Sequence, residues 1–175
     1  REYDCMVGVS GGVDSSYVIN LGHLYGLRML AVHIDDGLDT EIAKKNVIDL
    51  CKKANVKLIM VKPNKEQFTE LTLSLLKASV PNLAMEQDSV LEAALNDTAK
   101  QYDIKYLLSG GNFSLECILE RGDSINCADR KHLICIHKKY GTKSIKDLRL
   151  VSFWGKYIYQ GYFGLIKNVF PLNYI

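Results

Sequence analysis

The sequence contains no long apolar run, and none of its stretches reaches the roughly 18 uncharged apolar residues of a membrane-spanning helix. It also lacks the basic, apolar and small-residue succession of a secretory leader. Its five cysteines are odd in number and never occur as Cys-x-x-Cys, which argues against a disulfide framework or a self-contained zinc knuckle. We therefore expect a cytoplasmic protein without a transmembrane segment. Because the chain enters an apolar run almost at once and ends within an aromatic stretch, we expect flanking segments to be missing.

Charge of either sign is unevenly distributed along the chain. The 175 residues are 47% hydrophobic and 24% charged, which is the balance of a globular domain. Residues 1–120 carry 12 lysines and arginines against 17 aspartates and glutamates, whereas residues 121–156 carry 9 against 3. A local basic segment typically meets an anion such as a nucleotide, a sugar phosphate or RNA, or else forms a solvated surface.

Short apolar runs alternate with amphipathic stretches along most of the chain. Strands are expected at residues 3–9, 27–34, 57–61 and 105–108, and helices at 15–25, 40–54, 64–76, 88–102 and 129–140. This alternation predicts an α/β fold, a parallel sheet with helices on both faces. We expect residues 1–120 to form the core. Residues 121–175 would form a basic and aromatic extension, the start of an acceptor-binding or dimerisation region.

The most specific motif follows the first expected strand and opens the first helix. It reads SGGVDSS and comprises Ser10, Gly11, Gly12, Val13, Asp14, Ser15 and Ser16. Glycines let the backbone approach phosphate oxygens, the helix N-terminus offers free N–H groups, and the serines add hydroxyl donors. The motif lacks the lysine of a Walker A loop and the spacing of GxGxxG. It predicts an anion cradle of another kind.

Asp14 is out of place in a phosphate cradle unless a cation accompanies it. Mg²⁺ favours a few carboxylates together with phosphate oxygens, so we assign Asp14 to Mg²⁺. The alternative is that Asp14 only caps the helix. Glu116 is the second candidate ligand for the same metal.

Two further polar clusters follow other strands, and the carboxyl ends of parallel strands are where ligands bind. His33 lies at the end of the second strand and Asp35 follows it, while Gly110, Gly111 and Asn112 follow the fourth. We expect all five to contact ATP. A structural role for His33, and a turn role for Asp35 or its neighbour Asp36, remain open.

The SGGVDSS motif after a buried strand resembles the PP-loop of the ATP-pyrophosphatase superfamily, which has an adenine-nucleotide α-hydrolase-like fold. The resemblance implies that the loop holds the β- and γ-phosphates as a leaving pyrophosphate while a substrate oxygen attacks the α-phosphate. ATP and Mg²⁺ would be the cofactors, with Asp14 and Ser15 as catalytic residues.

Longer segments are similar to the N-acetyl sugar amidotransferase family of bacterial surface-polysaccharide and nonulosonic acid biosynthesis. They are VGVSGGVDSSYV, LRMLAVHIDDG, LLKASVP, KYLLSGGNFSLECIL, KHLICIHKKYGTKSIKDL and PLNYI. The resemblance implies that an acetamido group on a nucleotide-linked sugar becomes an acetamidino group, with ammonia from a glutaminase partner and no nucleic acid. It suggests Lys131, His132 and His137 as acceptor-binding residues. The family's flanking cysteine clusters are absent, so any zinc site lies outside this chain.

Two other functions stay open. The basic segment favours a tRNA-thiolating or other RNA-modifying PP-loop enzyme, which would need a sulfur-handling cysteine such as Cys117 or Cys127. A non-catalytic adenine-nucleotide-binding module is the other alternative, although Asp14 and Glu116 argue against it.

Overall fold

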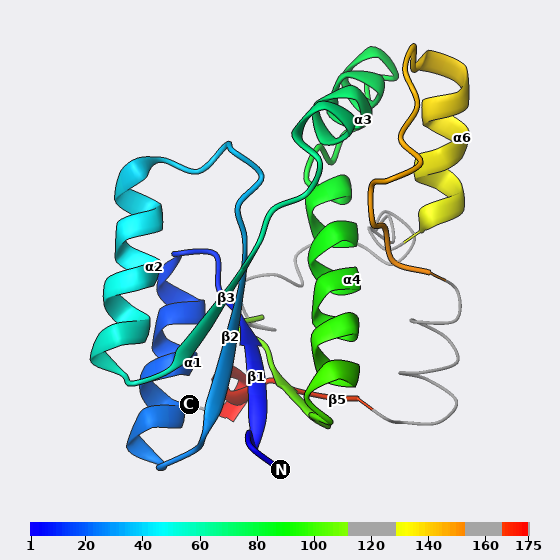
Figure 1. Cartoon of the computed structure of the whole chain (residues 1–175). Helices are drawn as coiled ribbons and strands as arrows, with labels where there is room; N and C mark the ends of the chain where they lie inside the picture. The colour runs from blue at the N-terminus through cyan, green and yellow to red at the C-terminus, as the bar shows by residue number, and fades with distance from the viewer. Residues whose placement is uncertain (112–128, 153–165, 175) are drawn as a thin grey trace.

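The computed structural model describes residues 1–111, 129–152 and 166–174 (Figure 1). The described strands are β1 (Cys5–Gly8), β2 (Met29–Ile34), β3 (Lys57–Val61), β4 (Tyr106–Leu108) and β5 (Lys167–Val169). The described helices are α1 (Val13–Leu24), α2 (Glu41–Lys53), α3 (Lys65–Lys77), α4 (Met85–Gln101) and α6 (Arg130–Tyr140), with a 3-10 turn, η2, at Pro171–Tyr174.

The five strands form one parallel sheet in the order β3-β2-β1-β4-β5. From the central strand β1 the chain first moves outward through β2 and β3, and it then returns to the other side of β1 as β4. The change of direction makes the carboxyl ends of β1 and β4 a topological switch point, where ligands bind in open α/β sheets. The SGGVDSS segment, residues 10–16, leaves β1 at this point. It is called the phosphate loop below, after its predicted role.

Helices cover both faces of the sheet, as the sequence predicts. Figure 1 shows α1 and α2 on one face and α4 on the other, with α3 and α6 packed beyond α4. All six residues of β2 are buried, as expected for a strand covered on both sides. The larger core lies on the α4 side and includes Met6, Leu30, Leu71 and Leu133.

Three of the described helices begin after a residue whose side chain accepts a hydrogen bond from the helix, whereas α1 and α4 have no such cap. Thr40, Asn64 and Asp129 accept hydrogen bonds from the third amide beyond them, at 3.1 to 3.2 Å, and so cap α2, α3 and α6. Gly12 precedes α1 and has no side chain to offer. The first amides of α1 are therefore left for another acceptor.

Two elements differ from the prediction. Helix α4 begins at Met85, and the residue before it is Ala84. The sequence predicted Asp88 or Ser89 as the residue before this helix. Strand β5 pairs with β4 through Lys167, Asn168 and Val169, although no strand was expected within the basic and aromatic extension at residues 121–175. Residues from both sides of position 120 therefore share one sheet.

Across residues 1–111, 129–152 and 166–174, every helix is too short or too polar to cross a membrane. Cys5 is 3% exposed in the core, and burial raises its pKa to about 11. This thiol is a packing residue rather than a nucleophile.

Candidate nucleotide-binding site

The phosphate loop turns sharply between β1 and α1. Gly11 has a φ of +83°, a backbone conformation that glycine adopts at little cost. The Ser16 and Ser15 hydroxyls donate to the Gly12 carbonyl over 2.7 and 3.3 Å. The Gly12 N–H in turn approaches Ser10 Oγ at 3.4 Å. These local contacts fold the loop over the uncapped start of α1.

The loop after β4 lies directly against the phosphate loop. A Cβ on Gly110 would lie only 3.0 Å from the Ser15 amide nitrogen and 3.2 Å from the Asp14 carbonyl carbon. The Gly111 N–H donates to Ser109 Oγ over 3.1 Å, and the Ser109 N–H donates to the Val169 carbonyl over 2.8 Å. The Ser-Gly-Gly segments at residues 10–12 and 109–111 thus meet at the switch point, and the lack of a side chain on Gly110 allows their close approach.

His33 links the end of β2 to the start of the phosphate loop. Its side chain is 2% exposed, and its Nδ1 lies 2.7 Å from the Val9 carbonyl. Because a carbonyl only accepts hydrogen bonds, Nδ1 carries a proton. Nε2 lies 3.1 Å from Asp39 Oδ2, and neither atom has a hydrogen-bond partner elsewhere among the described residues. The second ring nitrogen of His33 therefore faces the Asp39 carboxylate at the edge of the pocket.

Asp35 lies outside the pocket lining, although it was expected to bind ATP. Its carboxylate is 2.8 Å from Lys44 Nζ and 3.5 Å from Lys62 Nζ. The hydrogen bond from Lys44, with added attraction from Lys62, lowers the pKa of Asp35. Lys44 of α2 and Lys62, which follows β3, hold the carboxylate, and Asp39 lines the pocket instead.

Asp36 is 5% exposed and fixes the turn beyond β2. One carboxylate oxygen accepts the Leu38 N–H over 2.8 Å, and the other accepts from Gln87 Nε2 over 2.9 Å. The turn role that the sequence left open therefore belongs to Asp36.

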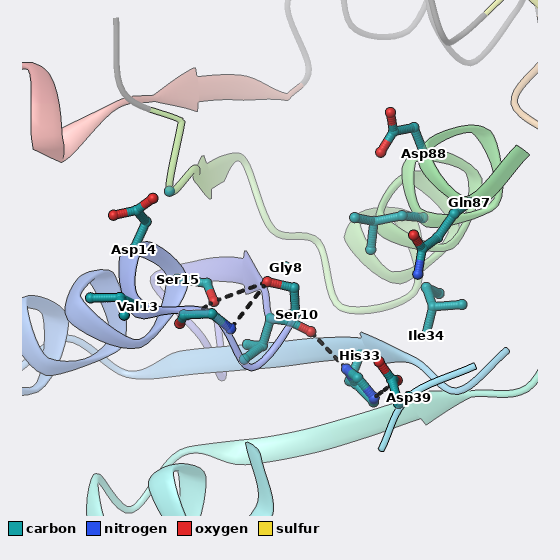
Figure 2. Close-up of a pocket in the computed structure, with 14 residues that line it drawn as sticks. Gly8, Ser10, Val13, Asp14, Ser15, His33, Ile34, Asp39, Gln87 and Asp88 are labelled. Atoms are coloured by element: carbon teal, nitrogen blue, oxygen red, sulfur yellow. Dashed lines mark hydrogen bonds and ion pairs between the residues drawn. The ribbon is translucent and has the colours of Figure 1, made fainter. Parts of the chain in front are cut away.

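The described elements enclose a pocket of about 300 Å³ at the carboxyl ends of β1 and β2 (Figure 2). Its lining is Gly8, Val9, Ser10, Gly12, Val13, Asp14, Ser15, His33, Ile34, Asp39, Gln87, Asp88, Leu91 and Gly110. Figure 2 shows Asp14 and Ser15 on one side and Gln87 and Asp88 on the other. Of the expected ATP-binding residues, the structure brings Ser10, Gly12, Asp14, Ser15, His33 and Gly110 together here.

Other expected residues lie near the pocket without lining it. Gly11 and Ser16 shape the phosphate loop, and Gly111 follows Gly110. Asn112 and Glu116 fall outside the described residues, as do Cys117 and Cys127.

Sequence reasoning missed Asp39, Gln87, Asp88 and Leu91. The last three lie on the first turns of α4, and none directly follows a strand. The only available signal was the acidic pair Glu86 and Asp88 in the first turn of α4.

The side chains of the pocket fit a magnesium ion that is held mainly by the phosphates of a bound nucleotide. Among residues 1–111, 129–152 and 166–174, no three His, Cys, Asp or Glu side chains form a metal-binding group. Mg²⁺ commonly relies on one or two carboxylates together with substrate phosphates and water. Asp14, beside the uncapped N-terminus of α1, suits that arrangement.

The expected acceptor-binding residues lie on α6 and do not line this pocket. The His137 Nδ1 lies 3.1 Å from Ser74 Oγ on α3. His132 lines a separate surface groove with Val80, Pro81 and Lys139, and Lys131 is exposed.

No protein-family model and no curated protein matches the chain. Solved structures match it by fold. NMN synthetase from Francisella tularensis has a TM-score of 0.50 at 17% identity, over 64% of this chain and 47% of its own. NH3-dependent NAD synthetase from Campylobacter jejuni, in complex with nitrate, has a TM-score of 0.53 at 16% identity, over 78% and 63%.

A predicted subunit of tRNA methyltransferase from Methanocaldococcus jannaschii has a TM-score of 0.53 at 16% identity, over 98% of this chain and 70% of its own. The chain thus spans 47% and 63% of the two synthetases. At these identities the likeness describes the fold alone. The chain has the adenine-nucleotide α-hydrolase-like fold, which it shares with these NMN and NAD synthetase structures.

Proposed function

We propose that this chain is an enzyme that binds ATP in the pocket at the ends of β1 and β2 and releases pyrophosphate. One observation carries the proposal: SGGVDSS forms a glycine turn at the uncapped N-terminus of α1, at the switch point of the sheet. Backbone N–H groups at a helix N-terminus bind phosphate, and the helix dipole favours its negative charge. Gly12, Ser10 and Ser15 line the pocket where those phosphates would lie.

Asp14 would hold Mg²⁺ in the bound state. The ion supplies electrostatic stabilisation to the charge that develops on pyrophosphate. The chain itself positions the triphosphate, because the Gly110 segment is packed against the Asp14 and Ser15 backbone and limits where the phosphates can lie. His33 supports the same loop through the Val9 carbonyl.

The finer proposal is that the substrate is the acetamido group of a nucleotide-linked sugar. The support is the sequence similarity to N-acetyl sugar amidotransferases. The acetamido oxygen would attack the α-phosphorus of ATP, and pyrophosphate would leave. Ammonia would then add to the imidate carbon, and AMP would leave with the former amide oxygen, giving the amidine.

Ammonia suits this scheme because adenylylation turns a poor leaving group into a good one. The NH3-dependent NAD synthetase shares the fold, so ammonia-using proteins occur within it. In our proposal a glutaminase partner delivers the ammonia, and Lys131, His132 and His137 contact the nucleotide portion of the acceptor.

The proposal is tested by incubating the full-length protein with ATP, Mg²⁺, ammonium and a panel of UDP- and CMP-linked acetamido sugars. Replacement of C=O by C=NH lowers the sugar mass by about one dalton, which mass spectrometry resolves, while AMP and pyrophosphate accumulate. Omitting ammonium should abolish the mass change. If no sugar of the panel changes mass while AMP and pyrophosphate still form, the sugar assignment fails and the ATP chemistry stands.

An RNA-modifying enzyme is the second candidate. It is favoured by the solved structure that matches 98% of this chain, which is a predicted subunit of tRNA methyltransferase. The basic residues of α6 and of the segment after it would then contact RNA phosphates.

A further inference from the structure

The phosphate loop occupies one side of the pocket, and the opposite side has a different chemistry. Ile34, at the end of β2, and Leu91 of α4 line the pocket with apolar side chains. Figure 2 shows Gln87 and Ile34 near each other on the side away from Asp14. Two apolar side chains and an amide are suited to a planar base. The Asp88 carboxylate on the same side would repel a phosphate.

The orientation of the Gln87 amide is fixed by its partner. Gln87 Nε2 donates to Asp36 Oδ2 over 2.9 Å. A carboxylate only accepts hydrogen bonds, so the nitrogen of the amide, and not its oxygen, must face Asp36. Asp36 is itself held by the Leu38 N–H over 2.8 Å and is 5% exposed, so it cannot swing away without losing that bond.

With the nitrogen held by Asp36, Oε1 and the second N–H of Gln87 make no other hydrogen bond within residues 1–111, 129–152 and 166–174, and they are offered to a ligand. This donor and acceptor pair matches the edge of adenine, whose 6-amino group donates and whose N7 accepts. Guanine and hypoxanthine carry a carbonyl oxygen at position 6. That oxygen would face the Gln87 oxygen, and two acceptors repel each other.

We infer that Gln87, oriented by Asp36, selects adenine over 6-oxopurines in this pocket. The inference rests on the proposed ATP-binding function and extends it to a residue that determines nucleotide specificity. Gln87 is the specificity residue, since it meets the base, and Asp36 is a positioning residue that acts through it.

The test measures the affinity of the full-length protein for MgATP, MgITP and MgGTP by isothermal titration calorimetry. A good bidentate contact changes base discrimination by on the order of 10- to 100-fold. We expect the wild type to bind ATP more tightly than ITP by that factor. We expect Gln87→Leu to reduce the ratio to about threefold or less.

Asp36→Asn provides an independent arm. An asparagine can accept the Leu38 N–H with its oxygen and present its nitrogen to Gln87, which would turn the Gln87 oxygen toward it. The amide would then offer donors to the base, so the preference for ATP over ITP should shrink or reverse. A purely structural Gln87 would not produce this change.

Gln67→Leu is the matched control, because Gln67 also donates its Nε2 to an aspartate, Asp147, over 2.8 Å, but lies outside the pocket. Its ATP to ITP ratio should equal that of the wild type. Since each ratio is taken within one variant, partial unfolding does not alter it.

The outcomes separate the two proposals. Equal affinity for ATP and ITP in the wild type, or an unchanged ratio in Gln87→Leu, overturns the role of Gln87 and leaves ATP binding intact. Failure of the wild type to bind any of the three nucleotides overturns the proposed function together with this inference.

Discussion

Asp14 places a carboxylate beside the N-terminus of α1 and inside the pocket that we propose binds ATP. We expect Asp14→Asn to lower Mg²⁺-dependent ATP turnover by roughly 100-fold, the effect typical of losing one preorganised electrostatic contact. Its side chain is exposed, so the free energy of unfolding should change by no more than about 1 kcal/mol. Turnover assays and urea unfolding measure the two effects.

The control for Asp14 is Asp103→Asn, which removes an exposed carboxylate paired with Arg1 far along the chain from the loop. It should leave turnover unchanged. If Asp14→Asn retains both the MgATP affinity and the turnover of the wild type, Asp14 does not bind the metal.

Gly110 allows the two Ser-Gly-Gly segments to meet. In Gly110→Ala, the new methyl group would press on the backbone of Asp14 and Ser15, 3.0 to 3.2 Å away. Backbone yields less readily than a side chain, so we expect a loss of about 1–3 kcal/mol in the free energy of unfolding and weaker ATP binding. Chemical denaturation and calorimetry check both.

Gly8→Ala serves as the stability control for Gly110, because the nearest atoms to its new methyl group would be Leu91 and Leu95 methyl groups at 3.7 Å, an ordinary van der Waals distance. The explanation fails if Gly110→Ala is as stable as Gly8→Ala and binds ATP as tightly as the wild type.

The site residues that the sequence predicted are those within motifs. Ser10, Gly12, Asp14, Ser15 and Gly110 could be found because glycine-rich loops after strands have a recognisable spacing. Asp39 could not, since its contact with His33 depends on the turn at Gly37, where φ is +85°. Gln87 was missed because the approach of α4 to β2 depends on the packing of the whole sheet.

At the scale of elements, Glu70 joins α3 to the turn that follows α6. Its carboxylate accepts the backbone N–H groups of Thr142 and Lys143 and the Thr142 hydroxyl. The two backbone hydrogen bonds are the main cause that lowers the pKa of Glu70 from 4.5 to about 2.

Because the folded pKa lies below the unfolded one, Glu70 stabilises the fold fully above about pH 4.5 and less as the pH falls toward 2. We therefore expect the urea midpoint of Glu70→Gln to change less than that of the wild type between about pH 5 and pH 2.5. Glu66→Gln, on the exposed side of the same helix, should follow the wild type. Parallel pH profiles for the wild type and Glu70→Gln would show that the pairing is not stabilising.

The sequence predicted nine of these elements to within a few residues, because apolar runs and caps such as Asn64 and Asp129 mark them locally. It placed the residue before α4 four or five positions late, at Asp88 or Ser89 rather than Ala84, because aspartate and serine are typical caps and alanine is not. It gave no sign of β5, whose three residues, Lys167–Val169, are too few to show a period and become a strand only by pairing with β4.

For the whole molecule, the distribution of charge bears on the choice between a sugar and RNA as the acceptor. The basic residues of α6 are gathered at both of its ends, with Arg130 and Lys131 in the first turn and Lys138 and Lys139 in the last. RNA would engage many of these charges together, and its affinity should then fall on the order of 10³-fold over a fourfold increase in salt. A nucleotide sugar offers only one or two phosphates.

We therefore expect weak tRNA binding at about 150 mM salt, while a UDP- or CMP-linked sugar protects the amides around Lys131, His132 and His137 from hydrogen exchange. Filter binding across a salt series and exchange mass spectrometry give the two readouts. Tight, saturable tRNA binding with no protection by any nucleotide sugar would favour the RNA-modifying enzyme.

The most direct test of the central claim is the identity of the nucleotide products. A cradle that holds a leaving pyrophosphate, without a Walker lysine, should cleave ATP between the α- and β-phosphates. Chromatography of a reaction of the full-length protein with ATP, Mg²⁺, ammonium and the acceptor panel should therefore show AMP and pyrophosphate in equal amounts. Stoichiometric ADP and phosphate would contradict the account.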